Sequence, residues 1–227
     1  MIAALALAAA LAASPVCTVD DATMTWGFKE SFRSYISGTI ANGEWTVSDG
    51  ATYETPYFGF SGGTGSLDGG VGTVSFGGSI EFTGHGGILD TIVSNPQIVF
   101  DGSDTATLLL DVSGTTQEGE PVDLDAVEFA TVKLDALEQD DAIVLTEAAT
   151  TLTADGAAAF GTYEAGEALD PIAATIPVAS GCATVTDRSG VTLLIGAAFA
   201  AIVVALVGSA VLIVVLLARR GRRHTPK

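Results

Sequence analysis

The chain has 227 residues, of which 48% are hydrophobic and 16% are charged, and its formal net charge is −18. Residues 1–188 hold all 27 acidic residues and four of the nine basic residues, a net charge of −23, and the last nine residues carry the other five bases. This segregation excludes one uniform soluble domain, and the acidic part excludes nucleic acid as a partner because it repels phosphates.

The N-terminal segment is an uninterrupted run of alanine, leucine and isoleucine over residues 2–13. It is shorter than the roughly 20 residues that a membrane-spanning helix needs. Ala10 and Ala12 provide the small residues that signal peptidase prefers. We therefore predict a signal peptide at residues 1–13 and export of the rest.

The only two cysteines, Cys17 and Cys182, lie near the two ends of the exported part. Export places them in a compartment that permits disulfides, and neither has a neighbouring cysteine or histidine for redox or metal chemistry. We therefore predict one disulfide between Cys17 and Cys182.

The first predicted element is a short amphipathic helix that begins near Gly27 and ends at Gly38. On a helix, four aromatic or aliphatic residues fall within about 100° of arc: Phe28, Phe32, Tyr35 and Ile36. Lys29 and Arg33 lie one turn apart at the edge of this arc, and Ser31 lies on the opposite side.

Glycine-rich, β-like segments follow the helix. Alternating apolar residues in 71–85 predict a half-buried strand, or a hairpin broken at Gly77 and Gly78, with His85 at its end. Further strands are predicted at residues 98–100, 105–112 and 127–134, a short helix or turn at 152–160, and a last strand bracketed by Pro171 and Pro177. The fold class predicted for residues 23–178 is a mainly β, sandwich-like domain with one or two short helices.

The C-terminal part reads as a membrane anchor. Small polar residues at 179–188 predict a stalk, and residues 190–218 form an apolar segment without charges that is long enough for one transmembrane helix. The basic tail at 219–227 marks the cytoplasmic side. We therefore expect a single-pass protein of the cell membrane whose N-terminal domain is extracellular.

Few residues suit enzymatic chemistry. Outside the tail, His85 is the single histidine, and the chain has no Cys-x-x-Cys, His-x-x-x-His, P-loop or Gly-x-Ser-x-Gly motif. Hydrolases and metal-dependent enzymes are thus poorly supported. On pattern alone, Tyr35 would be a core aromatic and His85 a hydrogen-bonding residue at a strand end, with a functional role as the alternative.

Three sequence blocks resemble the HtaA domain of bacterial haem-uptake proteins, in the family's order. They are Trp26–Ile36, then Phe82–Asp90 with Asn95–Pro96, and then Leu152–Phe160 with Tyr163–Gly166 and Leu169–Pro171. The resemblance covers approximately residues 23–178. It implies a single-domain, membrane-anchored surface haemoprotein, not an enzyme, that takes up haem and passes it toward a haem importer of the ABC type.

The resemblance also implies roles for individual residues. The family's tyrosine iron ligand falls on Tyr35 and its motif histidine on His85. A phenolate is a hard anionic ligand suited to ferric iron, so the implied cofactor is ferric haem b. His85 would hold the phenolate oxygen by a hydrogen bond, or it would ligate or cover the iron directly.

Haem carries two anionic propionates, and two interpretations of the nearby bases remain open. Lys29 and Arg33 would neutralise the propionates, or they would merely cap a surface helix. Phe32 shares the arc of Tyr35, so it would meet either the porphyrin face or the core.

The implied partners are haem, haem-carrying proteins, other surface haem receptors, a binding protein of an ABC importer, and the membrane. The alternative function is a β-rich cell-surface adhesin or wall-interaction module without a cofactor. A haem-degrading or peroxidase-like enzyme is least supported, because a single histidine leaves few groups for acid–base chemistry.

Overall fold

The computed structural model describes residues 16–179, apart from residues 117, 136, 140 and 162. Two short helices are present in this part, α1 (Glu30–Ser37) and α2 (Ala154–Phe160). The strands are β1 (Val16–Trp26), β2 (Glu44–Ser48), β3 (Thr52–Glu54), β4 (Tyr57–Asp68), β5 (Val71–Ser75), β6 (Ser79–Gly84), β7 (Leu89–Asp101), β8 (Thr105–Thr115), β9 (Pro121–Lys133), β10 (Leu137–Gln139), β11 (Ala142–Leu152) and β12 (Ala168–Pro177). The prediction of a mainly β domain with one or two short helices is confirmed.

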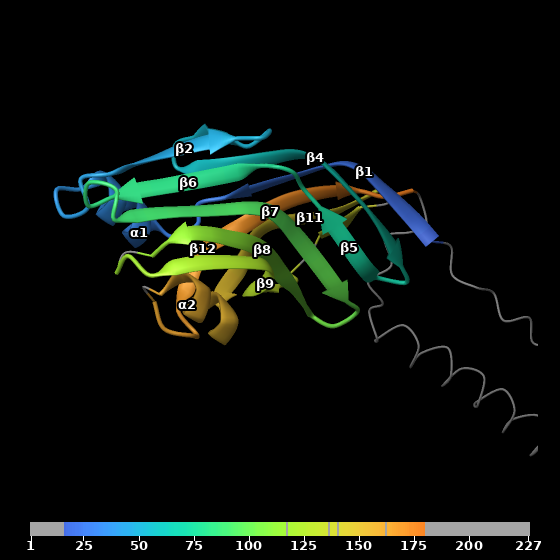
Figure 1. The fold of residues 1–227 in the computed structure, drawn as a ribbon. Helices are drawn as coiled ribbons and strands as arrows, with labels where there is room; N and C mark the ends of the chain where they lie inside the picture. The colour runs from blue at the N-terminus through green and yellow to red at the C-terminus, as the bar shows by residue number, and fades with distance from the viewer. Residues whose placement is uncertain (1–15, 117, 136, 140, 162, 180–227) are drawn as a thin grey trace, which may run out of the picture. The chain divides into compact units, whose positions relative to one another are not determined.

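The strands close into a barrel (Figure 1). Around the ring the order is β1–β4–β5–β7–β8–β9–β11–β12, every pairing is antiparallel, and β12 pairs with β1. The predicted sandwich-like arrangement is therefore corrected to a closed one. Alternation of apolar residues specifies which face of a strand is buried, but it does not specify that the first and last strands pair.

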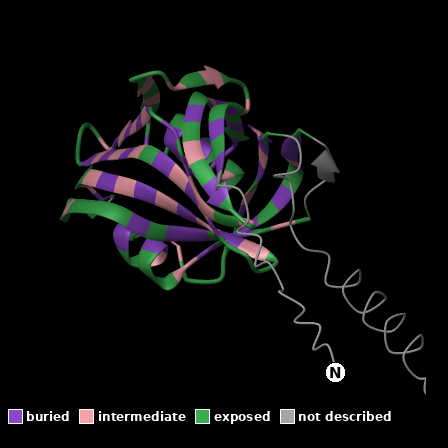
Figure 2. Cartoon of the chain, turned by 90° about the vertical axis from the view of Figure 1, so that its right-hand side faces the viewer, coloured by how far each residue is buried: buried purple, intermediate pink, exposed green. Residues whose placement is uncertain are grey.

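The segment 71–85 forms one interrupted strand and not a hairpin. Both β5 and β6 pair with β7, β5 with residues 97–101 and β6 with residues 89–94. The chain leaves the sheet between them at Gly77 and Gly78, where Gly78 has a φ of 133°. Inward and outward residues alternate along β6, as the sequence predicted, and also along β7. Figure 2 shows buried residues alternating with more exposed residues along the strands of the sheet.

The predicted strand at 98–100 is the end of the longer β7, and those at 105–112 and 127–134 correspond to β8 and β9. The helix at 152–160 is α2, and the last strand, β12, begins before Pro171. The strands β1 to β4, β10 and β11 were not predicted from the sequence. β2 and β3 lie outside the ring, where β2 pairs with β6 and β3 pairs with β4.

A cluster of aromatic side chains fills the end of the barrel near α1. The Phe28 ring is fully buried, and its centroid lies 4.7 to 5.7 Å from those of five other rings: Trp26, Phe32, Phe82, Phe129 and Phe160. These rings come from β1, α1, β6, β9 and α2. Their burial fixes both helices against the strands and so determines where α1 presents its exposed side.

Several predicted features lie outside the described residues. They are the signal peptide at 1–13, the stalk from residue 180 onward, the transmembrane helix at 190–218 and the tail at 219–227. Neither α1 nor α2 is long and apolar enough to cross a membrane. Cys17 is buried at the start of β1, but Cys182 is not among the described residues, so their pairing stays a prediction.

Candidate functional site

Four segments that are distant in sequence meet at the end of the barrel that carries α1 (Figure 1). They are α1, the turn between β6 and β7, the turn between β8 and β9, and the segment that follows α2. Side-chain hydrogen bonds connect them: Tyr35 to His85, Ser31 to Tyr163, and Thr115 to the Ile88 carbonyl. The site is therefore assembled by the barrel and not by one local motif.

The Tyr35 hydroxyl and His85 Nε2 form a hydrogen bond, and the two ring centroids are 5.7 Å apart. Both side chains are half-buried. Phe32 lies behind Tyr35 at a centroid distance of 6.1 Å and is fully buried. The sequence left two positions open for Phe32, against the porphyrin face or in the core, and the structure places it in the core.

A tight turn presents His85. Its backbone is left-handed, with a φ of 53°, and Gly86 and Gly87 that follow are also left-handed. Two backbone hydrogen bonds hold the turn, from His85 N to Ala41 O at 2.7 Å and from Gly87 N to Gly84 O at 3.0 Å. Gly86 and Gly87 adopt the left-handed conformation without strain because they lack a Cβ, and the turn places the His85 imidazole against the Tyr35 hydroxyl.

The Tyr35 hydroxyl is held in its protonated form. Burial raises the pKa of Tyr35, and electrostatic interactions with the Glu118 carboxylate and with Tyr163 raise this pKa further. A metal that binds the oxygen must therefore displace the proton, and the hydrogen-bonded His85 imidazole is positioned to accept it. The described residues contain no group of three His, Cys, Asp or Glu side chains that could hold a metal ion. A phenolate by itself suits a metal whose other ligands arrive with a bound molecule.

Lys29 and Arg33 both contact carboxylates. The residue Arg33 is 8% exposed. Its guanidinium lies 2.5 Å from Asp170 Oδ2 and also donates a hydrogen bond to the Gly27 carbonyl. A Cβ on Gly27 would lie 2.3 Å from Asp170 Oδ2, so this close approach requires glycine. Of the two interpretations of Arg33, these contacts favour the structural one.

Lys29 is less enclosed. Its Nζ donates to Glu167 Oε2 at 3.1 Å and to the Ala168 carbonyl at 2.7 Å, and it lies 4.8 Å from the centroid of the Tyr163 ring. Tyr163 Oη is in turn 3.1 Å from Ser31 Oγ, one helical turn before Tyr35. Lys29 thus belongs to the polar side of the site.

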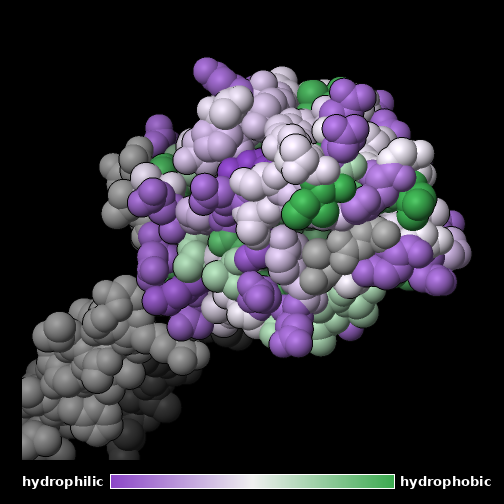
Figure 3. All heavy atoms as spheres, turned by 90° about the vertical axis from the view of Figure 1, so that its left-hand side faces the viewer, coloured by the Kyte–Doolittle hydropathy of each residue, from purple (hydrophilic) through white to green (hydrophobic). Residues whose placement is uncertain are grey.

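Ser31, Glu118 and Tyr163 were not predicted from the sequence as site residues. Tyr163 lies in the third block of the family resemblance, which was an available signal. Nothing in the sequence indicated Glu118. Ile40, which follows α1, and Ile88, in the turn between β6 and β7, are 74% and 56% exposed. Figure 3 shows hydrophobic patches among hydrophilic residues at this end of the barrel. Such exposed aliphatic side chains suit a planar apolar ligand.

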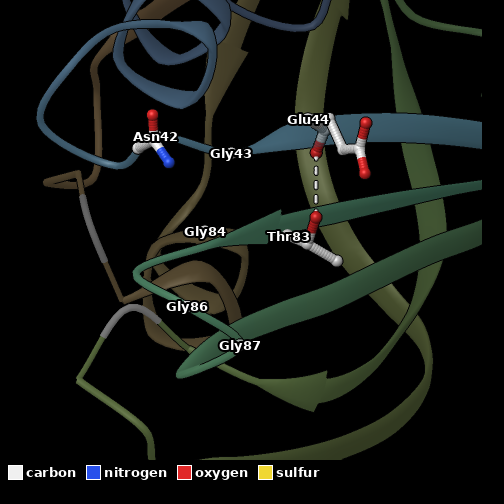
Figure 4. Close-up of a pocket in the computed structure, with 7 residues that line it drawn as sticks. All are labelled: Asn42, Gly43, Glu44, Thr83, Gly84, Gly86 and Gly87. Atoms are coloured by element: carbon white, nitrogen blue, oxygen red, sulfur yellow. Dashed lines mark hydrogen bonds between the residues drawn. The ribbon is translucent and has the colours of Figure 1, made fainter.

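A shallow pocket of about 310 Å³ lies beside the His85 turn (Figure 4). Its lining is polar or glycine and comes from the start of β2 and the end of β6: Asn42, Gly43, Glu44, Thr83, Gly84, Gly86 and Gly87. Thr83 Oγ1 donates to the Glu44 carbonyl at 3.4 Å. Neither Tyr35 nor His85 lines this pocket, so it is separate from the Tyr35 site.

Comparison with known proteins identifies relatives over this same part of the chain. The model of the HtaA family, described as Htaa, matches residues 21–175. The C-terminal domain of HtaA from Corynebacterium glutamicum is 34% identical, with a TM-score of 0.66 over 71% of this chain and 99% of that chain. The N-terminal domain of the same protein is 37% identical, with a TM-score of 0.63 and the same coverage.

The heme binding protein HtaB from the same organism is 27% identical, with a TM-score of 0.60 over 73% of this chain and 96% of that chain. No curated protein matches the chain.

Proposed function

The chain belongs to the HtaA family, and on this premise we propose that it is a haem-binding protein, not an enzyme, whose Tyr35 ligates the iron of ferric haem b. The family resemblance expected from the sequence is confirmed by the family model over residues 21–175. A solved relative described as a heme binding protein shares the fold. These findings support haem binding in general, and the assignment of the ligand is our inference.

The observation that carries the assignment is the hydrogen bond between Tyr35 and His85. A phenolate suits ferric iron, and the porphyrin supplies the equatorial ligands when haem is bound. His85 would receive the displaced proton and hold the phenolate oxygen in place. Tyr35 is half-buried, and Ile40 and Ile88 would cover apolar parts of the macrocycle.

The polar side of the site suits the propionates. The Ser31 and Tyr163 hydroxyl groups can donate hydrogen bonds, and Lys29 supplies a positive charge. Arg33 is left out of this role because it is buried and its guanidinium binds Asp170 and the Gly27 carbonyl. Lys29 is also paired, but its partner Glu167 has a side chain that is 46% exposed. We therefore assign Arg33 to holding α1 in place.

We further propose that the protein is anchored in the cell membrane by residues 190–218, with residues 23–178 outside the cell. In that position it would receive haem from haem-carrying proteins or other surface receptors and pass it toward an ABC-type importer. The apolar segment, the basic tail and the N-terminal signal support this location. A ligand site at the rim of the barrel suits transfer between proteins.

Hemin titration of the purified full-length chain tests the ligand, with Tyr35→Phe as the variant and Tyr57→Phe, an exposed tyrosine in β4, as the control. Wild type and control are expected to show the Soret band of tyrosinate-ligated ferric haem. Tyr35→Phe is expected to lose or shift that band and to bind hemin at least about tenfold more weakly. An unchanged spectrum and affinity in Tyr35→Phe would show that the ligand is another residue. A wild-type chain that binds no hemin would favour the adhesin alternative.

A further inference from the structure

Lys29, on the polar side of the site, is bound by a carboxylate of its own chain. Its Nζ donates to Glu167 Oε2 at 3.1 Å and to the Ala168 carbonyl at 2.7 Å. The Lys29 side chain is 14% exposed, whereas that of Glu167 is 46% exposed. The base is therefore enclosed, and its carboxylate partner lies toward the solvent.

A series of contacts leads from Lys29 to the helix that carries Tyr35. The Lys29 ammonium lies 4.8 Å from the centroid of the Tyr163 ring, and Tyr163 Oη is 3.1 Å from Ser31 Oγ. Ser31 and Tyr35 are four residues apart in α1, so they are neighbours on one side of the helix. The series of polar groups therefore ends one helical turn from the proposed iron ligand.

The backbone of Glu167 is fixed, but its side chain is free to turn away. Its carbonyl accepts a hydrogen bond from Leu152 N at 2.9 Å, and its N–H donates to the Glu164 carbonyl at 3.2 Å. Within residues 16–179 as described, the Glu167 carboxylate has no hydrogen-bond partner except Lys29. Rotation of this one side chain would therefore release the ammonium and leave the backbone in place.

The pair of Arg33 with Asp170 differs on each of these points. The Asp170 side chain is 22% exposed, and it binds both the Arg33 guanidinium and the Glu30 backbone N–H. Its rotation would break the attachment of α1 to β12. Of the two pairs on this helix, the one between Lys29 and Glu167 is thus the exchangeable one.

We propose that Glu167 competes with a haem propionate for Lys29 and thereby speeds the release of haem. The proposal rests on the proposed function and deepens it, because it names a group that regulates the same site. A propionate and Glu167 offer the ammonium the same carboxylate chemistry, and two carboxylates at one ammonium repel each other. When haem leaves, Glu167 binds Lys29 again, so the enclosed base does not remain uncompensated.

The test measures the transfer of hemin from the full-length chain to an excess of apomyoglobin. Glu167→Gln removes the charge and keeps the size of the side chain. Glu164→Gln is the matched control, because Glu164 is an exposed acid three residues earlier that makes no ion pair in the described part of the chain. Both variants change the net charge equally, so a difference between them reports the contact with Lys29.

Glu167→Gln is expected to release hemin about two- to fivefold more slowly than wild type, the size of effect that one partly exposed ion pair produces. Glu164→Gln should resemble wild type. The difference should disappear when Lys29→Met is added to both chains. It should also disappear with hemin dimethyl ester, whose esterified propionates carry no charge.

A second measurement uses the haem-free chain. The sequence has three lysines, at positions 29, 133 and 227, so the NMR signals of their ε-methylene groups are few enough to assign. Glu167→Gln is expected to shift the signal of Lys29 and to leave the other two unchanged. An unshifted Lys29 signal would show that the pair does not form in solution and would overturn the proposal.

Equal hemin release from Glu167→Gln and Glu164→Gln would also overturn the competition, and so would an equal slowing of the dimethyl ester. Failure of the wild-type chain to bind hemin would instead overturn the proposed function.

Discussion

Arg33 is a charged residue in an interior position, and its pair with Asp170 is what makes that position tolerable. The guanidinium is largely buried, and Asp170 also accepts a hydrogen bond from the Glu30 backbone N–H at 3.0 Å. Asp170 lies in β12, so the pair connects the start of α1 to the strand that closes the barrel. Removing one partner of such a pair leaves the other charge uncompensated in a poorly solvated place.

We predict that Arg33→Met lowers the free energy of unfolding by about 3 kcal/mol. Urea unfolding, followed by the fluorescence of the buried Trp26, measures this loss. Lys133→Met is the control, because the pair of Lys133 with Asp135 is 58% and 74% exposed and contributes at most about 1 kcal/mol. Equal effects of the two substitutions would contradict the structural role of Arg33.

Periodicity at single residues identified the apolar arc of α1 but not which of its members would face the ligand. The predicted position of Phe28 on this helix was wrong, because α1 begins at Glu30 and the φ of Phe28 is 63°, which is not helical. Phe32 and Ile36 are fully buried, whereas Tyr35 remains half-buried at the edge of the same arc. The difference depends on where the helix meets β2 and β6, which a periodic pattern does not specify. The pairing of Tyr35 with His85 was implied only by family resemblance, because a separation of 50 residues leaves no local signal.

At the scale of elements, α2 depends on an N-terminal cap that also contacts the sheet. Thr153 Oγ1 accepts a hydrogen bond from Gly156 N at 3.0 Å and lies 3.2 Å from the Phe129 carbonyl of β9. A Cβ on Gly156 would lie 2.2 Å from that same carbonyl oxygen, so α2 packs against β9 at backbone distance. The cap therefore positions Tyr163 and Gly161, which follow the helix.

We predict that Thr153→Ala destabilises the protein by about 1 to 2 kcal/mol, because the Gly156 N–H loses its acceptor and the contact with β9 is lost. Thr153→Ser keeps the hydroxyl and should lose less than half as much. Thermal unfolding of the haem-free chain measures both variants. If serine and alanine destabilise equally, the cap is not what holds α2.

Residues 71–85 show what an alternating apolar pattern predicts about a strand and what it does not. The even positions are inward along both β5 and β6, as the pattern predicted. Whether the two glycines produce a hairpin or a gap in one strand depends on β7, which offers a single edge long enough for both pieces. The choice between a hairpin and an interrupted strand therefore depends on β7, which the alternating pattern of residues 71–85 does not describe.

At the scale of the whole molecule, the acidic charge acts against the ligand that we propose. Residues 1–188 carry a net charge of −23, and hemin carries anionic propionates. Long-range repulsion therefore slows their encounter, and salt screens it over about 10 Å at 0.1 M.

We predict that the association rate of hemin rises by up to about tenfold as sodium chloride is added to a low-salt buffer. Stopped-flow absorbance measures the rate, and sucrose of matched osmolality is the control that leaves the charges unscreened. A rate that falls with salt would mean that the local charge of Lys29 outweighs the charge of the domain.

The sequence by itself determined the segregation of charge, the β-rich class, the short helices and, through three motif blocks, the family. These properties follow from composition and from local spacing, which a linear chain carries directly. Only the tertiary structure decided that the strands close into a barrel, that Arg33 is bound to Asp170, and that Tyr163 is hydrogen-bonded to Ser31 of α1. Each of these depends on contacts between residues far apart in the chain, and such contacts arise from the pairing of strands and from the packing of the aromatic core.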